Sequence, residues 1–155
     1  MKIFIVFFAI LVLNISFLCF NNDMDRYVKL QSHLKSLAEE SAAGASLFKD
    51  EEKYSQGILV INDSAAIAYI DFIIKKAMEN SQNYRDGIIT KSIFFFDDLR
   101  GYDQASDLRI DHQRPCVVVS LTFTGKDMFR LPFICVKSIS RTASYQWDDV
   151  LTSSF

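Results

Sequence analysis

The sequence predicts an α+β protein in which a long N-terminal helix leads into a small head made of a second helix and an antiparallel β-sheet. Three observations carry this prediction. Residues 3–20 form an almost unbroken apolar run, residues 23–48 repeat apolar side chains at helical spacing, and a strand-like signal begins at residue 88. Beyond the apolar run about 135 residues remain, which is enough for one domain with a hydrophobic core.

The N-terminal apolar run, IFIVFFAILVLNISFLCF at residues 3–20, has the length of a membrane span. As a helix it would rise about 27 Å, close to the hydrocarbon thickness of a bilayer. A cleaved signal peptide has a shorter apolar core and small residues before its cleavage site, whereas this run ends Phe17-Leu18-Cys19-Phe20. We therefore expect residues 1–22 to stay attached as a single-pass anchor; a removed signal peptide is the alternative.

Charge and composition restrict the expected partners. The formal net charge is −2 and the basic residues are scattered, so the chain has no electrostatic footprint for nucleic acid. Lys2 alone precedes the apolar run, which by the positive-inside rule places the N-terminus in the cytoplasm and the head outside. Membrane lipid is then the expected partner of the anchor.

Residues 23–48 are typical of an amphipathic helical extension of the anchor, with apolar or small residues spaced alternately three and four apart. No proline occurs between Met1 and Phe48, so we expect one continuous helix; a separate helix after a loop at residues 21–23 is the alternative. The small residues of SAAGAS, at residues 41–46, allow close approach by another helix or sheet. We expect a helix-packing interface with other subunits here, formed by Leu34, Leu37, Ser41, Ala42, Gly44, Ala45 and Phe48. A large residue at Gly44 should then weaken assembly more than folding.

The head domain, residues 49–155, starts with a charged, solvated connection at residues 49–56. A short buried strand is expected at residues 58–61, and a core-facing helix at about residues 65–80. The polar Asn62-Asp63-Ser64 before this helix supplies its N-cap.

The rest of the head is predicted to be an antiparallel meander. Residues 88–96 read as a strand, residues 116–124 and 128–138 as a hairpin around Gly125-Lys126, and residues 143–147 as a last short strand. Pro132 indicates an edge or bulge in the hairpin's second strand.

The two head cysteines, Cys116 and Cys135, would lie directly opposite each other in that hairpin. The counted position is a hydrogen-bonded site, where side chains are farther apart than at the alternating sites. We therefore expect two small buried apolar residues with reduced thiols, and a disulfide is the alternative.

The sequence offers few groups for catalysis or metal binding. It holds two histidines, no pair of them at ligand spacing and no phosphate-binding or nucleophile motif. His33 and His112 are expected to be solvated, with a general base at His112 as the alternative. Asp97-Asp98, with Asp103 and Asp107, could hold Ca²⁺, although a solvated loop is the simpler interpretation. We expect no enzyme activity, no catalytic residue, no metal and no cofactor.

The segment LKSLAEESAAGASLF at residues 34–48, followed by DEE at residues 50–52, Tyr54, Gly57 and ILVI at residues 58–61, resembles one family. These are the TadE-like, pseudopilin-type membrane-anchored proteins of Gram-positive bacteria, and the likeness covers about residues 1–80. The resemblance implies a single-pass membrane protein with an extracytoplasmic head, working as a minor component of a pilus or secretion assembly. Its partners would be other pilin-like subunits, bound through the N-terminal helix. The alternative function is a secreted or membrane-tethered binding module with a cleaved signal peptide.

Overall fold

The structure is a computed structural model that describes residues 2–81, 84, 87–102, 114–131 and 134–147. The described elements are α1 (Lys2–Ser46), α2 (Glu51–Ser55), α3 (Asp63–Asn80), β1 (Gly87–Phe96), β2 (Cys116–Gly125) and β3 (Ser138–Gln146). The strands form one antiparallel sheet in the order β1-β2-β3. The chain therefore has the α+β fold that its sequence predicts.

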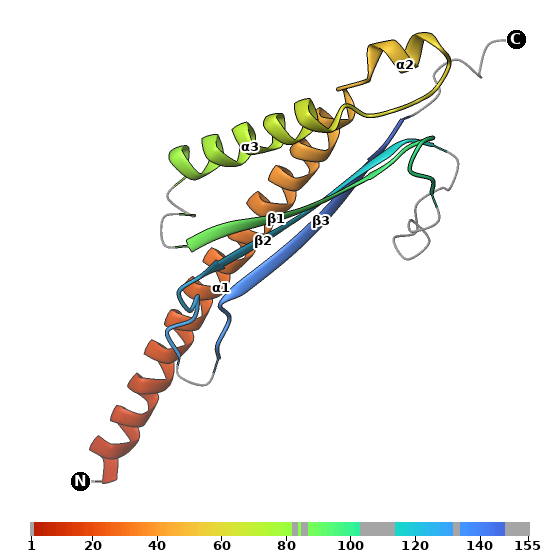
Figure 1. Ribbon diagram of the computed structural model, residues 1–155. Helices are drawn as coiled ribbons and strands as arrows, with labels where there is room; N and C mark the ends of the chain where they lie inside the picture. The colour runs from red at the N-terminus through yellow and green to blue at the C-terminus, as the bar shows by residue number, and fades with distance from the viewer. Residues whose placement is uncertain (1, 82–83, 85–86, 103–113, 132–133, 148–155) are drawn as a thin grey trace, which may run out of the picture.

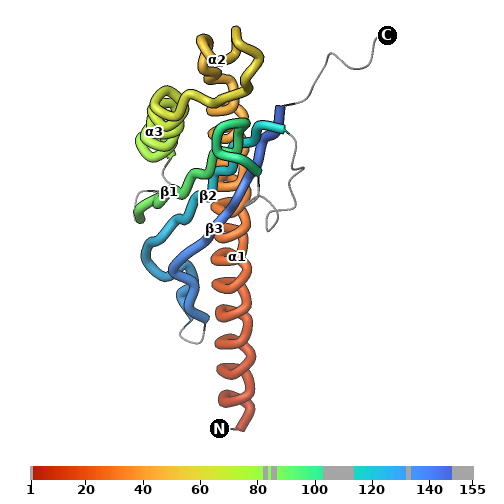
Figure 2. Tube along the Cα trace, turned by 45° about the vertical axis from the view of Figure 1, so that its right-hand side comes forward, coloured from red at the N-terminus to blue at the C-terminus, as the bar shows by residue number. Residues whose placement is uncertain are grey.

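Helix α1 is a single unbroken rod of 45 residues, about 68 Å long. The alternative of a loop at residues 21–23 is therefore wrong. Its two halves differ in surroundings: the N-terminal half projects away from the rest of the chain, and the C-terminal half lies against α3 and the sheet (Figure 1, Figure 2). The head thus includes the C-terminal half of the helix that also carries the apolar run.

The start of the head differs from expectation at residues 49–61. A short helix, α2, replaces part of the expected solvated connection, and Asp50 caps it by accepting a hydrogen bond from the Lys53 amide. The expected strand at residues 58–61 is reduced to one isolated bridge between Lys49 and Ile61. The physical reason is that the Leu59 and Ile61 amides donate to aspartate carboxylates rather than to a neighbouring strand.

Helix α3 confirms the prediction of a capped, core-facing helix. Asn62 is its N-cap and accepts a hydrogen bond from the Ala65 amide, so the helix begins at Asp63, two residues earlier than expected. Ile70, Ile73 and Ile74 are buried. Ile67 and Met78, which the apolar stripe also includes, lie at its margins and are exposed.

The sheet confirms β1 and β2 but not the predicted hairpin. β3 begins at Ser138, so the expected strand at residues 128–138 is wrong, and the expected last strand at residues 143–147 is the second half of β3. Cys116 pairs with Gln146 in the β2–β3 register, not with Cys135. The Asp127 carboxylate accepts bonds from the Phe129 and Val136 amides, which holds this connection as a loop. Pro132 lies outside the described residues.

One hydrophobic core joins the helices to the sheet. Helices α1 and α3 cover one face of the sheet, and the other face points away from them (Figure 2). The core contains Leu34 and Ala38 of α1, Ile70 of α3, and the inward side chains of the strands, which include Val117, Val119, Leu121, Phe123 and Ile139.

Candidate interaction surfaces

The N-terminal half of α1 is an extended, exposed apolar surface. Large side chains from Ile3 to Leu18 are exposed, and none of the apolar window in this helix is buried against the rest of the described chain. Helix α1 is long enough and apolar enough to cross a membrane, and an N-terminal signal sequence has the same properties. This exposed surface cannot be a core helix of the head, because nothing in the described chain covers it.

The expected helix-packing residues lie elsewhere, inside the chain's own core. The structure buries Leu34, Leu37, Ser41, Ala42 and Ala45 against α3 and the sheet, and packs Phe48 against the same core. Gly44 lies under the ring of Tyr69, where a Cβ atom would come within 2.1 Å of Cε1. The small residues do allow a close approach, but the partner is α3 of the same chain. Five of the seven residues are therefore part of the chain's own core, and contact of this set with another subunit stays a prediction.

A polar and aromatic junction, which we did not predict, joins the two halves of α1 to the connection between β2 and β3. Asp23 is fully buried, and its carboxylate accepts hydrogen bonds from the Arg130 amide, Nε and Nη2 at 2.9, 2.9 and 2.8 Å. The Phe129 ring lies 6.1 Å from that of Phe20 and 6.0 Å from that of Tyr27. The head is thus fastened to α1 directly after the apolar run ends.

The electrostatics of this junction favour the ion pair. The hydrogen bonds from Arg130, together with its charge, hold the pKa of the Asp23 carboxyl below its usual range despite burial. The same contacts raise the pKa of Arg130. Both groups are therefore charged at neutral pH. A sequence signal existed, because Asp23 is an acid at a helical position that otherwise faces the core, but its partner is 107 residues away.

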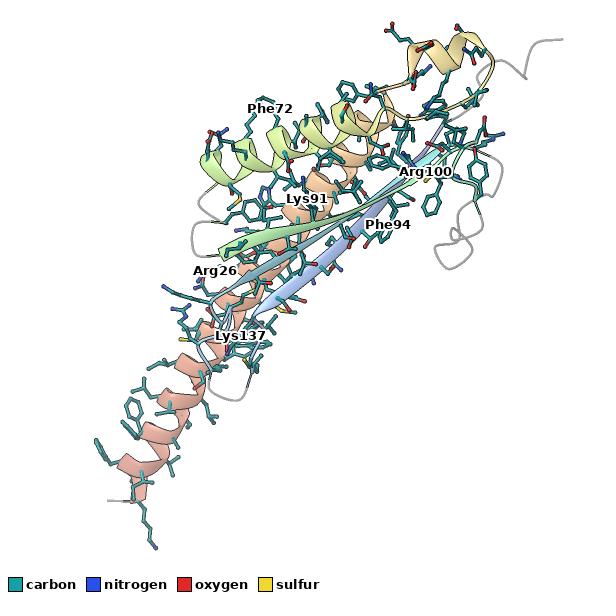
Figure 3. All side chains as sticks on the ribbon, viewed as in Figure 1. Arg26, Phe72, Lys91, Phe94, Arg100 and Lys137 are labelled. Carbon is teal, nitrogen blue, oxygen red and sulfur yellow. The ribbon has the colours of Figure 1, made fainter. Side chains whose placement is uncertain are left out.

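The outer face of the sheet is a surface rich in hydroxyl groups. Its fifteen outward positions in the three strands hold nine serines and threonines and no charged residue. Two cross-strand hydroxyl pairs join β2 to β3, Thr122 with Ser140 and Thr142 with Ser120, at 3.0 and 2.9 Å. Phe94, labelled in Figure 3, is exposed on this face. Such a face can accept and donate hydrogen bonds but cannot select a charged ligand.

The Asp97-Asp98 pair is a structural junction. Asp97 is buried and accepts bonds from the amides of Ile61, Leu99 and Arg100 and from the Arg100 guanidinium. Asp98 accepts from the Leu59 amide and the Tyr102 hydroxyl. These carboxylates are already engaged, and no cluster of metal-ligating side chains occurs among the described residues. Asp103 and Asp107 lie outside that part of the chain.

A shallow groove of about 550 Å³ runs between α1 and α3. His33 is exposed at its rim, as expected for a solvated residue, with Glu40 and Lys76 also among the lining residues. Tyr84 also lines it, and its buried hydroxyl has no hydrogen-bond partner. Burial raises the pKa of this hydroxyl, so the phenol stays protonated at neutral pH. No nucleophile–base pair is described in the groove, and His112 falls outside the described residues.

The three cysteines occupy different environments and are unpaired in the structure. Cys116 is fully buried, as expected, and burial raises its thiol pKa to about 11. Cys135 is exposed, contrary to expectation, and its hydrogen bond to Asp127 raises its pKa. Cys116 and Cys135 do not lie opposite each other. The expectation of reduced thiols depended on a poorly placed cross-strand pair, and that pair does not exist in the structure.

Comparison of this chain with protein-family models, with curated proteins and with solved structures finds no match.

Proposed function

We propose that this protein is a membrane-anchored, non-enzymatic structural subunit of the pilin-like type, with its head outside the cytoplasm. One observation carries the proposal: a single helix is exposed and apolar along its first half and forms part of the head's core along its second half. An apolar half-helix of this length is stable when lipid or other apolar helices surround it. The subunits would associate through this exposed half, because the apolar residues of the second half, such as Leu34 and Leu37, are buried in the chain's own core.

The exposed half carries features that suit helix association in lipid. Between lipid-embedded helices, small residues and amides contribute more than large apolar residues, because lipid solvates apolar surface equally well. Ala9 and Ser16 are small residues within the run, and Asn14 places an amide near its middle. The Asn14 side chain donates to the Ile10 carbonyl at 2.8 Å, and its amide oxygen remains an acceptor for a neighbouring helix.

The junction at Asp23 favours retention of the anchor over its removal. Phe20 packs against Phe129, and Asp23, one helical turn later, is fastened to Arg130. Cleavage near residue 20 would remove one aromatic partner and place a free amino terminus on the turn that carries the buried carboxylate. The intact helix keeps both contacts.

Flanking charge and domain length favour opposite orientations of the head. Arg26, Lys29 and Lys35 follow the apolar run within fifteen residues, whereas Lys2 precedes it, so a full count of flanking charges favours a cytoplasmic head. Long domains, however, translocate largely regardless of flanking charge. The proposal of an external head rests on the length of residues 49–155 and on the pilin-like arrangement.

Native thiols make orientation directly testable. In cells stripped of their wall, a membrane-impermeant maleimide at mildly alkaline pH should label exposed Cys135 but not buried Cys116. The Cys135→Ser chain is the matched control and should lose the label. Labelling that requires permeabilised cells would place the head in the cytoplasm. Mass spectrometry of the membrane-extracted chain gives its N-terminus, and a chain starting near Asn21 would refute the retained anchor.

Association through the exposed half is tested by crosslinking in membranes. Cysteines introduced one at a time at Val12, Leu13, Asn14 and Ile15, in a Cys19→Ser/Cys135→Ser chain, sample one helical turn of the exposed half. At least one should give crosslinked oligomers, while Glu79→Cys, exposed on α3, should not. Crosslinks absent at all four positions would contradict assembly through α1.

A second function, a tethered or secreted binding module, is favoured by the uncharged outer face of the sheet. A row of hydroxyl groups beside an exposed phenylalanine suits a neutral polar ligand. A soluble chain that lacks residues 1–20 and is recovered from the medium would select this function over the first.

A further inference from the structure

The connection between β2 and β3 lies beside α1 directly after the apolar run. We call its described residues, 126–131 and 134–137, the membrane-proximal loop. Phe129 contacts Phe20, and Arg130 is fastened to Asp23 at three atoms. In Figure 1 this loop is the part of the head nearest the free half of α1, and Figure 3 places Lys137 and Arg26 at the same end.

The helix sets the depth at which this loop would meet a membrane. If residues 3–20 span the hydrocarbon core, Asp23 lies about 4–5 Å beyond its edge, at 1.5 Å per residue. The headgroup region on each side is about 5–7 Å thick. The hydrogen bonds between Asp23 and Arg130 therefore place the loop at headgroup depth, because α1 is continuous through this point.

Charge distinguishes this end of the head from the opposite end. Residues 20–29 and 126–137 contain five basic and three acidic side chains, in a chain whose net charge is −2. The opposite end, around α2 and the end of β1, holds three basic and six acidic residues: Lys49, Asp50, Glu51, Glu52, Lys53, Asp63, Asp97, Asp98 and Arg100. The basic groups are accessible, since Lys126, Lys137 and Arg26 are exposed. Arg130 keeps 58% of its side-chain surface exposed although Asp23 holds it.

The loop also carries apolar side chains between its cations. Met128, Leu131 and Ile134 are half-buried, and Phe129 is buried against α1. Basic residues flanking apolar ones are typical of segments that lie in the membrane interface, where apolar groups meet the acyl boundary and cations meet phosphates.

From this placement we infer that the membrane-proximal loop is a second membrane contact, which binds anionic phospholipid headgroups through Lys126, Arg130 and Lys137, together with Arg26 of the adjacent part of α1. The inference rests on the proposed anchoring by α1. Each basic residue near an anionic surface strengthens binding roughly fivefold. The full chain should therefore select anionic lipid from a mixed bilayer.

The test uses the full chain in vesicles of phosphatidylcholine with a minority of phosphatidylglycerol. Electron spin resonance of spin-labelled lipids reports the relative association of phosphatidylglycerol and phosphatidylcholine with the protein surface. We expect a preference for phosphatidylglycerol of roughly fivefold in the wild-type chain, lower at high salt because exposed charges are screened. Lys126→Gln/Lys137→Gln should lower this preference clearly, with part of it retained through Arg130 and Arg26. Lys53→Gln/Lys75→Gln removes the same charge from α2 and α3 and should leave the ratio unchanged.

The outcomes separate this inference from the proposed anchor. Flotation with vesicles of phosphatidylcholine alone reports anchoring by α1, and unchanged Trp147 fluorescence reports an intact head in each variant. A chain that floats but shows a ratio near one, or whose ratio survives Lys126→Gln/Lys137→Gln, overturns the headgroup contact and leaves the anchor standing. A chain that does not float at all overturns both.

Discussion

Gly44 decides how closely α1 and α3 approach, and its replacement by alanine is the sharpest test of their packing. A Cβ atom there would lie 2.1 Å from Tyr69 Cε1, 2.4 Å from Cζ and 2.5 Å from Oη. The ring must move, and with it the contact to Phe48, whose ring centroid is 5.6 Å away. Overpacking of this kind typically costs about 1–3 kcal/mol. The higher helix propensity of alanine offsets about 1 kcal/mol of this cost in the free energy of unfolding.

We therefore expect Gly44→Ala to lower the free energy of unfolding by up to about 2 kcal/mol. In a Tyr69→Ala background the clash is absent, so the same Gly44→Ala change should raise it by up to about 1 kcal/mol. A change in the sign of this stability effect would identify the Tyr69 ring as its cause, because a general preference for alanine or glycine at position 44 would act equally in both backgrounds. Gly44→Leu should be worse than Gly44→Ala, and should damage folding of the head before it affects assembly.

The assay is urea unfolding of the full chain in detergent micelles, followed by fluorescence. Trp147 is the sole tryptophan, and its Nε1 donates to the Ser46 carbonyl at 2.8 Å, two residues beyond Gly44. The four chains of the cycle give the coupling energy between the two positions directly. If Gly44→Ala stabilises the wild-type chain as much as the Tyr69→Ala chain, the close approach of α1 and α3 described here is wrong.

Three further predictions use the same unfolding assay or simple thiol chemistry. The pKa of Asp23 is lower in the folded than in the unfolded chain, so the ion pair contributes its full stability above the unfolded-state pKa near 3.8 and loses it as the pH falls through the folded-state pKa. Asp23→Asn should therefore make the free energy of unfolding less sensitive to acid. An unchanged pH profile of stability would count against the buried ion pair. Ser41 Oγ is buried without a hydrogen-bond partner, so Ser41→Ala should stabilise the head by about 1 kcal/mol, and a clear loss of stability would show that the hydroxyl has a partner. Native alkylation should modify Cys135 and spare Cys116 until urea unfolds the head, and equal rates at the two thiols would contradict the burial of Cys116.

Local patterns in the sequence were sufficient for most of the helices and for two strands. The spacing of Leu30, Leu34 and Leu37 correctly predicted the buried face of α1, because helical periodicity is a local property. Asn62 correctly marked the start of α3, since an N-cap acts on amides within three residues. Exposure alternates along β1 and along β2 from Val119 onward, according to which side of each strand meets the core, whereas residues 116–119 are all buried.

The predictions that were wrong have a common physical cause: side chains distant in the sequence take the contacts or hydrogen bonds that the local pattern assigned to something else. Residues 128–136 resemble a strand, but Phe129 is buried against α1 and Asp127 accepts the amides that a strand would use. β3 is rich in serine and has Ile139 as its one fully buried side chain, so its own signal is weak. The packing of residues 41–45 was assigned to another subunit because sequence alone does not show that α3 takes that place. Asp23 stands out as an acid on the core-facing side of α1, but its partner Arg130 is 107 residues away and could not be identified from the local sequence.

The continuity of α1 bears on the choice between the two functions. A tethered binding module gains reach from a flexible linker between anchor and head. Here no flexible linker separates the anchor from the head. Helix α1 continues from the apolar run into the core, which it has entered by Leu30, and Asp23, three residues after Phe20, is already bound to Arg130 of the head. The tilt of the anchor therefore fixes the direction of the head, as Figure 2 makes visible. A rigid coupling of this kind restricts the search for a ligand, but it lets neighbouring helices set the spacing of their heads, which is what a subunit of an ordered assembly requires.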